Sequence, residues 1–226
     1  MGGKIRKIAL TGGPCAGKTA LLESLKAEFG DDVLIVPEAA TQLLAVPYEE
    51  GGIGIPGRDV EWSQEWQDRF QKMIIEKQLQ DETFYTQLAD GRERPTVVVC
   101  DRGVLDGAAY TTGGREEFVQ KFNLQLETCF QLYDEVIHLN SLATDKPDLY
   151  EELKSTNPTR FEDAERAREL DEKLFAAYEG HPNHLRIQSG EGIEHKIETC
   201  FTEIRKLLRE PQEDKETQSE LKPPVI

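Results

Sequence analysis

The sequence lacks any long hydrophobic run and any excess of basic charge. No stretch approaches the roughly 18 consecutive apolar residues of a membrane-spanning helix, so we expect no transmembrane segment. The 226 residues include 27 Lys and Arg against 43 Asp and Glu, which gives a formal net charge of −16. Nucleic-acid binding depends on a basic surface, so this balance argues against nucleic acid as a partner.

Cysteine is also scarce, and no two cysteines have the C-x-x-C spacing of a metal site or redox motif. The four are Cys15, Cys100, Cys129 and Cys200. This pattern favours reduced thiols in a cytoplasmic protein. The chain is long enough for one α/β domain and too short for two independent ones of ordinary size.

What the sequence does contain is a glycine-rich loop, LTGGPCAGKTALLESL, from residue 10 to 25. Gly12 is followed after four residues by Gly17, Lys18 and Thr19, which matches the phosphate-binding motif G-x-x-x-x-G-K-[ST]. The apolar run before it predicts a strand, and the leucine spacing after it predicts a helix. The predicted nucleotide-binding residues are Gly12, Gly13, Pro14, Cys15, Ala16, Gly17, Lys18, Thr19 and Ala20.

Such a loop binds phosphate through backbone N–H groups at the positive end of a helix, and this works only where side chains stay out of the way. Lys18 is expected to reach the β- and γ-phosphates, and the Thr19 hydroxyl to ligate Mg²⁺. The expected cofactors are therefore ATP, with GTP as an alternative, and Mg²⁺.

Further apolar runs predict strands at 33–37, 96–101, 135–140 and 184–188. Together with the strand before the loop they predict an α/β fold, a five-stranded parallel sheet with helices on both faces. We expect residues 1–209 to form one nucleotide-binding domain. The polar, proline-bearing residues 210–226 predict a disordered tail.

The strand at 96–101 ends in Asp101, which places a carboxylate beside the phosphate loop. In P-loop proteins such an acid holds Mg²⁺, usually through water, although an Asp at a strand end can instead cap the next helix. The next residue is Arg102, whereas motor-type ATPases generally have glutamate there. We therefore favour phosphoryl transfer. Arg102 itself either holds substrate or pairs with an acid, and both alternatives stay open.

Three elements together resemble the P-loop nucleoside and nucleotide kinases: GGPCAGKT at 12–19, VPE at 36–38 and DRG at 101–103. The chain is most similar to the AAA-type domain of nicotinamide riboside kinase-like proteins, over residues 5–208. The resemblance implies a P-loop NTPase fold, Mg²⁺–nucleotide binding and transfer of the γ-phosphoryl group to a small hydroxyl compound.

The resemblance also assigns roles to individual residues. Glu38 is expected to contact the acceptor hydroxyl as a general base, with a helix-start role as the alternative. A helical lid at about 141–164 is expected to bring Arg160 to the γ-phosphate. Arg166 follows in the same arginine-bearing segment and either contacts substrate or forms a surface salt bridge.

Between the second and third strands, Trp62, Trp66, Phe70 and Ile74 recur every fourth residue, which predicts one helix stripe. Such a stripe packs into the core or stacks on a substrate ring. On the same segment, Gln71 and Gln78 either contact a substrate's amide or ring edge or lie on a solvated face.

Two functions follow from these patterns. The first is a small-molecule kinase that uses Mg²⁺–ATP and a nucleoside-like acceptor. The second is an ATP- or GTP-binding switch without a small-molecule acceptor, for which TDKPD at 144–148 is a weak match to the guanine-recognition element N-K-x-D. The sequence leaves the acceptor, the choice of base and the oligomeric state open.

Overall fold

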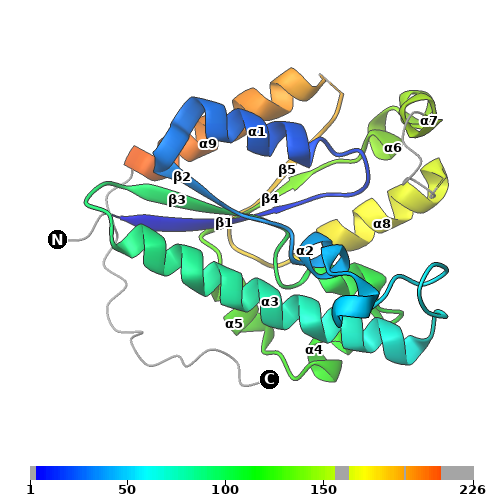
Figure 1. Ribbon diagram of the computed structural model, residues 1–226. Helices are drawn as coiled ribbons and strands as arrows, with labels where there is room; N and C mark the ends of the chain where they lie inside the picture. The colour runs from blue at the N-terminus through cyan, green and yellow to red at the C-terminus, as the bar shows by residue number, and fades with distance from the viewer. Residues whose placement is uncertain (1–3, 156–162, 191, 210–226) are drawn as a thin grey trace.

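The computed structural model describes residues 4–155, 163–190 and 192–209. Its centre is a sheet with helices on both faces (Figure 1). The strands are β1 (Ile5–Thr11), β2 (Val33–Val36), β3 (Thr96–Asp101), β4 (Glu135–Leu139) and β5 (His184–Ile187). All neighbouring strands pair in parallel, in the order β2-β3-β1-β4-β5. The predicted five-stranded parallel α/β fold is confirmed.

The helices of the described residues connect these strands. They are α1 (Lys18–Phe29), α2 (Ala39–Ala45), α3 (Gln64–Asp90), α4 (Gly114–Lys121), α5 (Leu126–Gln131), α6 (Leu142–Asp145), α7 (Pro147–Ser155), α8 (Ala164–Ala176) and α9 (Ile193–Arg209). Helices α1 and α9 cover one face of the sheet, and the long α3 crosses the other (Figure 1). Short 3₁₀ turns lie at Gly30–Asp32, Tyr48–Glu50 and Asp106–Tyr110.

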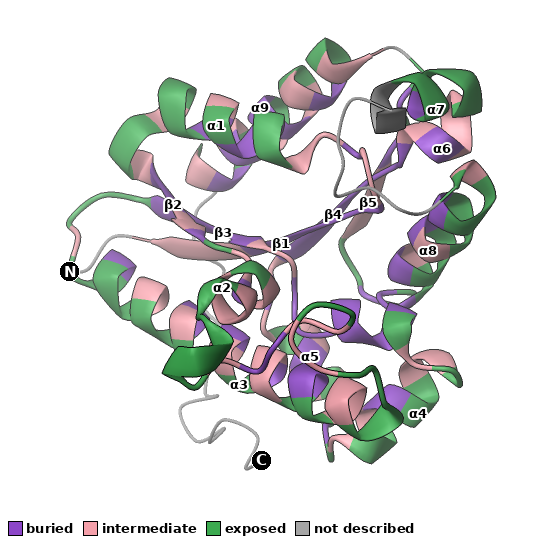
Figure 2. Cartoon of the chain, turned by 45° about the vertical axis from the view of Figure 1, so that its right-hand side comes forward, coloured by how far each residue is buried: buried purple, intermediate pink, exposed green. Residues whose placement is uncertain are grey.

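Most strand residues are buried because both faces of the sheet are covered, while the start of β1 and most of β5 are half-buried (Figure 2). Successive side chains of a strand point to opposite faces. Accordingly, Ile8 and Leu10 of β1 pack with the α1–α9 layer, whereas Ala9 packs with the α3 layer. This explains why the strands appear in the sequence as continuous apolar runs rather than alternating ones.

The sheet brings the ends of β1, β2 and β3 together at one edge. Because β1 is central and pairs with β3 on one side and β4 on the other, the loop after β1 lies at the middle of that edge. Ligands of open α/β sheets bind where the strand order reverses, outside the carboxyl ends of the strands. The topology therefore points to the phosphate-loop edge as the place to look for a site.

Three sequence expectations need adjustment or lie outside these ranges. Trp62 precedes α3, which begins at Gln64, so it is not part of the helix stripe. The predicted lid at 141–164 includes α6 and α7, while Arg160 and the tail 210–226 lie outside the described residues. Within the described ranges, no helix is both long and apolar enough to cross a membrane.

The sheet-to-helix packing yields a stability prediction. Leu21 of α1 is fully buried against the sheet, so Leu21→Ala should lower the free energy of unfolding by about 2–5 kcal/mol through lost burial and the cavity left behind. Leu149→Ala, on the exposed surface of α7, is the matched control and should change it by less than about 0.5 kcal/mol. Urea unfolding measures both, and equal effects would contradict the assigned packing.

Candidate functional site

The loop after β1 owes its shape to two glycines. Gly12 has φ 145°, and a Cβ there would lie 2.3 Å from the Leu139 carbonyl oxygen at the end of β4. Gly17 has φ 93°, and a Cβ there would lie 2.5 Å from Cδ1 of Ile193 on α9. The left-handed backbone conformation disfavours a side chain at both motif positions, and at Gly12 the close approach of the Leu139 backbone excludes one as well.

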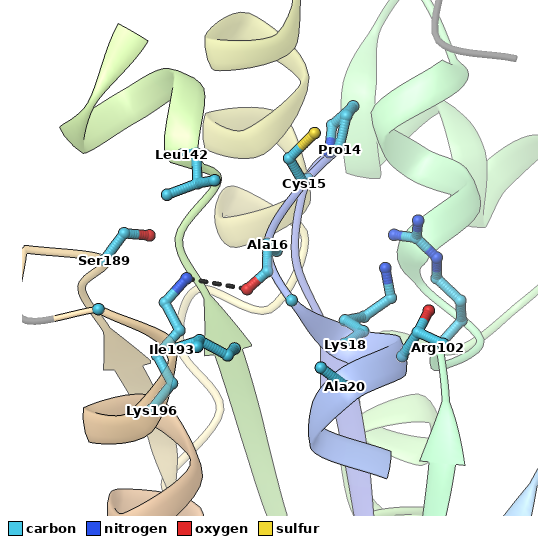
Figure 3. Close-up of a pocket in the computed structure, with 14 residues that line it drawn as sticks. Pro14, Cys15, Ala16, Lys18, Ala20, Arg102, Leu142, Ser189, Ile193 and Lys196 are labelled. Carbon is cyan, nitrogen blue, oxygen red and sulfur yellow. Dashed lines mark hydrogen bonds between the residues drawn. The ribbon is translucent and has the colours of Figure 1, made fainter. Parts of the chain in front are cut away.

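Helix α1 begins directly after Gly17, and no side-chain hydrogen bond caps its N-terminus. The first N–H groups of a helix have no intrahelical partner and attract anions. A cavity of about 370 Å³, which we call the phosphate-loop cavity, opens in front of them. It is lined by Gly13, Pro14, Cys15, Ala16, Gly17, Lys18, Thr19, Ala20, Arg102, Leu142, Ser189, Gly192, Ile193 and Lys196 (Figure 3). Of the predicted loop residues, all except Gly12 line it.

Lys18 and Arg102 bring two cations to this cavity (Figure 3). Burial lowers the pKa of Lys18 to about 8, and the charge on Arg102 acts in the same direction. The carboxylates of Asp101 and Glu38 oppose the shift. Lys18 and Arg102 thus place two cations beside the first N–H groups of α1, which suits the binding of phosphate groups.

Lys196 of α9 is a further cation of this cavity that the sequence analysis missed. Its ammonium group, only 2% exposed, donates hydrogen bonds to the carbonyl oxygens of Ala16 (2.8 Å) and Asn140 (2.6 Å), the first of which is drawn in Figure 3. Burial lowers its pKa to about 8. Lys196 therefore ties the phosphate loop to the end of β4.

Asp171 of α8 holds the other side of the loop. One carboxylate oxygen accepts a hydrogen bond from the Gly13 amide (2.8 Å), and the other accepts from the Ser141 amide (3.0 Å) and the Thr144 hydroxyl (2.8 Å). His138 Nε2 lies 3.2 Å from the first oxygen. Burial alone would raise the pKa of Asp171, but these hydrogen bonds and His138 outweigh it and lower the pKa. The buried carboxylate is therefore an ionised anchor.

Asp101 lies at the end of β3, close enough to Lys18 for the two charges to interact. Its Oδ1 atom is buried and has no hydrogen-bond partner among the described residues. Burial raises the pKa of this carboxyl group, while Lys18 opposes the shift. An oxygen ligand that is buried and unpartnered at this position is what a hard cation such as Mg²⁺ would coordinate, directly or through water.

Arg102 forms the centre of the site. Its Nε donates to Glu38 Oε1 (3.1 Å), and its Nη1 donates to the Gly12 carbonyl oxygen (3.0 Å) and to Asp106 Oδ2 (3.2 Å). Its backbone adopts φ 83°, in the left-handed region, where the Leu10 carbonyl accepts its amide hydrogen bond. Arg102 therefore pairs with two acids, which is one of the two alternatives left open by the sequence, and its contact with substrate stays a prediction.

Glu38 is the N-cap residue of α2, but its side chain does not cap the helix. The carboxylate instead accepts hydrogen bonds from Arg102 and from the Thr41 hydroxyl. Burial would raise the pKa of Glu38, but Arg102 and these hydrogen bonds overcome it and lower the pKa. Glu38 is therefore ionised near neutral pH and accepts hydrogen bonds.

Asp106 accepts hydrogen bonds from groups in several separate segments of the chain. Besides Arg102, it accepts from the hydroxyl groups of Thr11 and Tyr178 and from the Gly103 amide. Tyr178 also accepts the Leu105 amide hydrogen bond. The loop after β3 is thereby fixed to β1 and to the segment after α8.

A second cavity, of about 310 Å³, adjoins the first, and Arg102 lines both. We call it the inner cavity. Its lining comprises Glu38, Ala39, Ala40, Trp66, Gln67, Phe70, Gln71, Ile74, Gln78, Arg102, Gly103, Asp106, Gly107 and Tyr110. The stripe of α3 therefore contributes Trp66, Phe70 and Ile74 to a cavity wall rather than only to the core.

The two predicted glutamines of α3 both line the inner cavity but differ in their bonding. The Gln78 amide nitrogen donates to Glu82 Oε1 and to the Arg102 carbonyl oxygen, both at 2.9 Å. Gln71 is 6% exposed, and its Oε1 has no partner among the described residues. Neither lies on a solvated face, and Gln71 keeps hydrogen-bonding capacity for a ligand.

The remaining predicted residues lie away from this edge or outside the described ranges. Arg160 lies outside them, so its contact with the γ-phosphate stays a prediction. Arg166 is exposed on α8 and pairs with Glu169 (2.6 Å), and it is not among the described residues lining the phosphate-loop cavity. Asp145 of the TDKPD segment bonds to the Asn140 side chain and the Ser189 amide, which gives no support to a guanine-recognition element.

The residues that sequence reasoning missed carried one common signal. Lys196 shares a helix face with the buried Cys200 and Ile204, and Asp171 shares one with Ala167 and Leu174. A charged residue at an apolar position of an amphipathic helix is rarely buried without a partner. That pattern marks both residues as anchors, although it does not identify the partner.

Comparison with known proteins places this geometry in context. A family model described as an AAA domain matches residues 7–196, well over half of the chain. The matched range contains β2 to β5, all of β1 except its first two residues, and every described residue that lines the phosphate-loop and inner cavities. No curated protein matched the chain.

The lowered pKa of Lys18 yields a pH prediction. Bound phosphates would raise that pKa above its value of about 8 in the ligand-free protein. Because the bound-state pKa is the higher one, affinity is fully present below pH 8 and should fall above it, by up to about tenfold per pH unit. Fluorescent-nucleotide titrations from pH 6.5 to 9.5 measure this dependence.

Lys196 has a similar pKa, so Lys196→Met is the control that separates the two lysines. The loss of affinity above pH 8 should persist in this variant. A pH profile that is flat in the wild type, or that becomes flat in Lys196→Met, would show that Lys18 is not the titrating group.

Proposed function

The chain belongs to the AAA-domain family, and from this membership and the paired cavities we propose that it is a Mg²⁺-dependent phosphotransferase. It would move the γ-phosphoryl group of ATP to the hydroxyl group of a small, nucleoside-like acceptor. The fold and the phosphate loop support nucleotide binding. The similarity to nicotinamide riboside kinase-like proteins noted from the sequence favours the same class of acceptor.

One observation carries the acceptor half of the proposal: the inner cavity adjoins the phosphate-loop cavity and shares Arg102 with it. A group transfer needs the two substrates to meet in one space with the reacting atoms aligned. A nucleotide-binding switch has no need of a second small-molecule cavity at this point. The geometry therefore favours transfer over the switch.

The lining of the inner cavity supports a flat acceptor with a polar edge. Trp66 and Phe70 have ring centroids 5.0 Å apart and form an aromatic wall from α3. Flat rings pack favourably on such walls. Gln71 can then exchange hydrogen bonds with the edge of a base or of a carboxamide-bearing ring.

Glu38 is the residue proposed to contact the acceptor hydroxyl. Its lowered pKa makes it a weak base, but phosphoryl transfer proceeds through a loose transition state that depends more on alignment and charge neutralisation than on proton removal. An ionised carboxylate in the lining of the inner cavity, bonded to the Arg102 that lines both cavities, can orient the hydroxyl group toward the γ-phosphate. Arg102, bonded to Glu38, holds that carboxylate in place.

Thr19 and Asp101 are proposed to hold Mg²⁺. The unpartnered Oδ1 of Asp101 and the position of Thr19 in the first turn of α1 fit an oxygen-ligated cation. The described residues contain no cluster of three or more His, Cys, Asp or Glu, so phosphate and water oxygens would have to complete the coordination shell. When bound, Mg²⁺ neutralises charge on the phosphates. Lys18 and Arg102 supply the protein's own cations.

The direct test supplies the protein with Mg²⁺, ATP or GTP, and a panel of nucleosides, nicotinamide riboside and small alcohols. Mass spectrometry should detect a phosphorylated acceptor with at least one nucleoside-like compound. Lys18→Ala should form none and should lose nucleotide binding. Nucleotide that is retained or hydrolysed with no phosphorylated acceptor would instead support the switch.

Glu38→Gln tests the acceptor contact separately. The neutral amide keeps the shape but loses the charge that orients the hydroxyl group, so turnover should fall by about 10²-fold or more while nucleotide affinity changes little. Glu49→Gln, at an exposed glutamate of the following loop, is the matched control and should behave as the wild type. Full activity of Glu38→Gln would restrict Glu38 to its structural role at the start of α2.

Asp101→Asn tests the metal site. Removing one carboxylate charge from the cation's surroundings should raise the Mg²⁺ concentration needed for half-maximal nucleotide binding by about tenfold. Asp90→Asn, at the exposed end of α3, is the control. Calorimetric titrations at several Mg²⁺ concentrations measure the shift, and an unchanged Mg²⁺ dependence would remove Asp101 from the proposed metal site.

A further inference from the structure

A third cavity, of about 470 Å³, lies beside the inner cavity, and we call it the outer cavity. It is lined by Trp62, Gln64, Gln67, Ala109, Tyr110, Thr111, Thr112, Arg166, Leu170 and Lys173. Gln67 and Tyr110 line both cavities. A ligand held in the inner cavity can therefore extend past Tyr110 into the outer one.

The charge of the outer cavity is unusual for this chain. Its described lining contains two cations, Arg166 and Lys173, and no carboxylate, although the whole chain has 43 acidic residues against 27 basic ones. Together with Leu170, the two cations lie at helical spacing along one face of α8. Helix α8 thus presents a positively charged stripe to the cavity.

The nearest competing acid is Glu169, which pairs with Arg166 at 2.6 Å. Both side chains of this pair are more than half exposed, so the pair contributes little stability and can exchange for another anion. Among the described residues, Lys173 pairs with no carboxylate. Asp68, which accepts from Gln64 near the rim, is already paired with Lys121.

The same lining contains two exposed aromatic side chains. Trp62 is 63% exposed and Tyr110 is 48% exposed, which is high for side chains of this size. Thr111 and Thr112 also line the cavity. A cavity lined by both aromatic rings and cations is suited to a ring that carries a negative charge.

We propose that the outer cavity is a binding subsite for an anionic aromatic group, with a carboxylate or phosphate held by Arg166 and Lys173 and the ring packed on Trp62 and Tyr110. That this group is part of the acceptor molecule rests on the proposed function. That the outer cavity binds an aromatic anion does not. The acceptor class then narrows to flat compounds that carry a negative group at the end remote from the reacting hydroxyl.

The tryptophans of the chain can report ligand binding through their fluorescence. It contains two tryptophans, Trp62 in the outer cavity and Trp66 in the inner one. In Trp66→Phe, all tryptophan fluorescence comes from the outer cavity. In Trp62→Phe, it comes from the inner cavity. Each variant thus reports the occupancy of one cavity.

The probes are benzoate, phenyl phosphate and the neutral benzamide, each added to protein saturated with Mg²⁺ and a non-hydrolysable ATP analogue so that the phosphate loop is occupied. Benzoate and phenyl phosphate should produce a saturable change in the Trp62 fluorescence of the Trp66→Phe variant. Benzamide should require a concentration at least tenfold higher for the same change. The two anions separate a preference for carboxylate from one for phosphate. Calorimetry of the wild-type protein with the same probes checks that Trp66→Phe has not altered the site.

Charge variants complete the test. The double variant Arg166→Gln and Lys173→Gln should weaken binding of both anions at least tenfold and leave benzamide unchanged. Arg168→Gln removes one charge from an exposed position of α8 outside the described lining and should have no effect, whereas Glu169→Gln should strengthen anion binding.

Equal binding of benzamide and benzoate, or unchanged anion binding in the double variant, would overturn the subsite. The result is separable from the proposed function. Loss of acceptor phosphorylation with intact anion binding would refute the kinase and leave the subsite. Phosphorylation of neutral acceptors without anion binding would support the kinase and refute the subsite.

Discussion

The guanidinium group of Arg102 is the interaction on which the rest of the site depends. Its hydrogen bonds reach the Gly12 carbonyl after β1, Glu38 after β2 and Asp106 after β3, so one side chain joins the loops of three adjacent strands. A buried cation requires such partners, because an unpaired buried charge is costly. The three loops are therefore held in the positions at which they can bond to Arg102. The phosphate-loop and inner cavities share this side chain because it forms part of the wall between them. Displacing it would disturb both cavities at once.

The sequence predicted those features that depend on local patterns. The phosphate loop is recognisable because Gly12 and Gly17 are required by their backbone conformation, and Gly12 also by the nearby Leu139 backbone, which leaves a fixed spacing in the chain. The strands were predicted because a sheet covered on both faces needs continuous apolar runs. Asp101 could be recognised for the same reason, as the first polar residue after such a run.

The features that sequence reasoning missed depend on contacts between distant segments. Lys196 lies 180 residues from Ala16, and Asp171 lies 158 residues from Gly13. No local pattern pairs such residues, although their apolar helix positions mark them as unusual. The cavities are harder still to predict. The inner one combines residues of α2, α3 and the loop after β3, and the outer one combines residues of α8 with Trp62, the start of α3 and residues 109–112. The cavities form only when these segments come together in the fold, so no local sequence pattern predicts them.

Asp171 gives the segment that begins at Ser141 a particular mechanical character. Its carboxylate bonds to Ser141 and Thr144 at the start of that segment and to Gly13 in the phosphate loop, while Asp171 itself stands near the segment's end. The start of this segment is therefore held by two hydrogen bonds to the same carboxylate that bonds to the phosphate loop. Breaking them would leave a buried charge without these partners, which is costly. The bonds from Asp171 therefore fix Gly13 of the phosphate loop to Ser141 and Thr144, so the shape of the loop depends on a carboxylate 158 residues away in the chain.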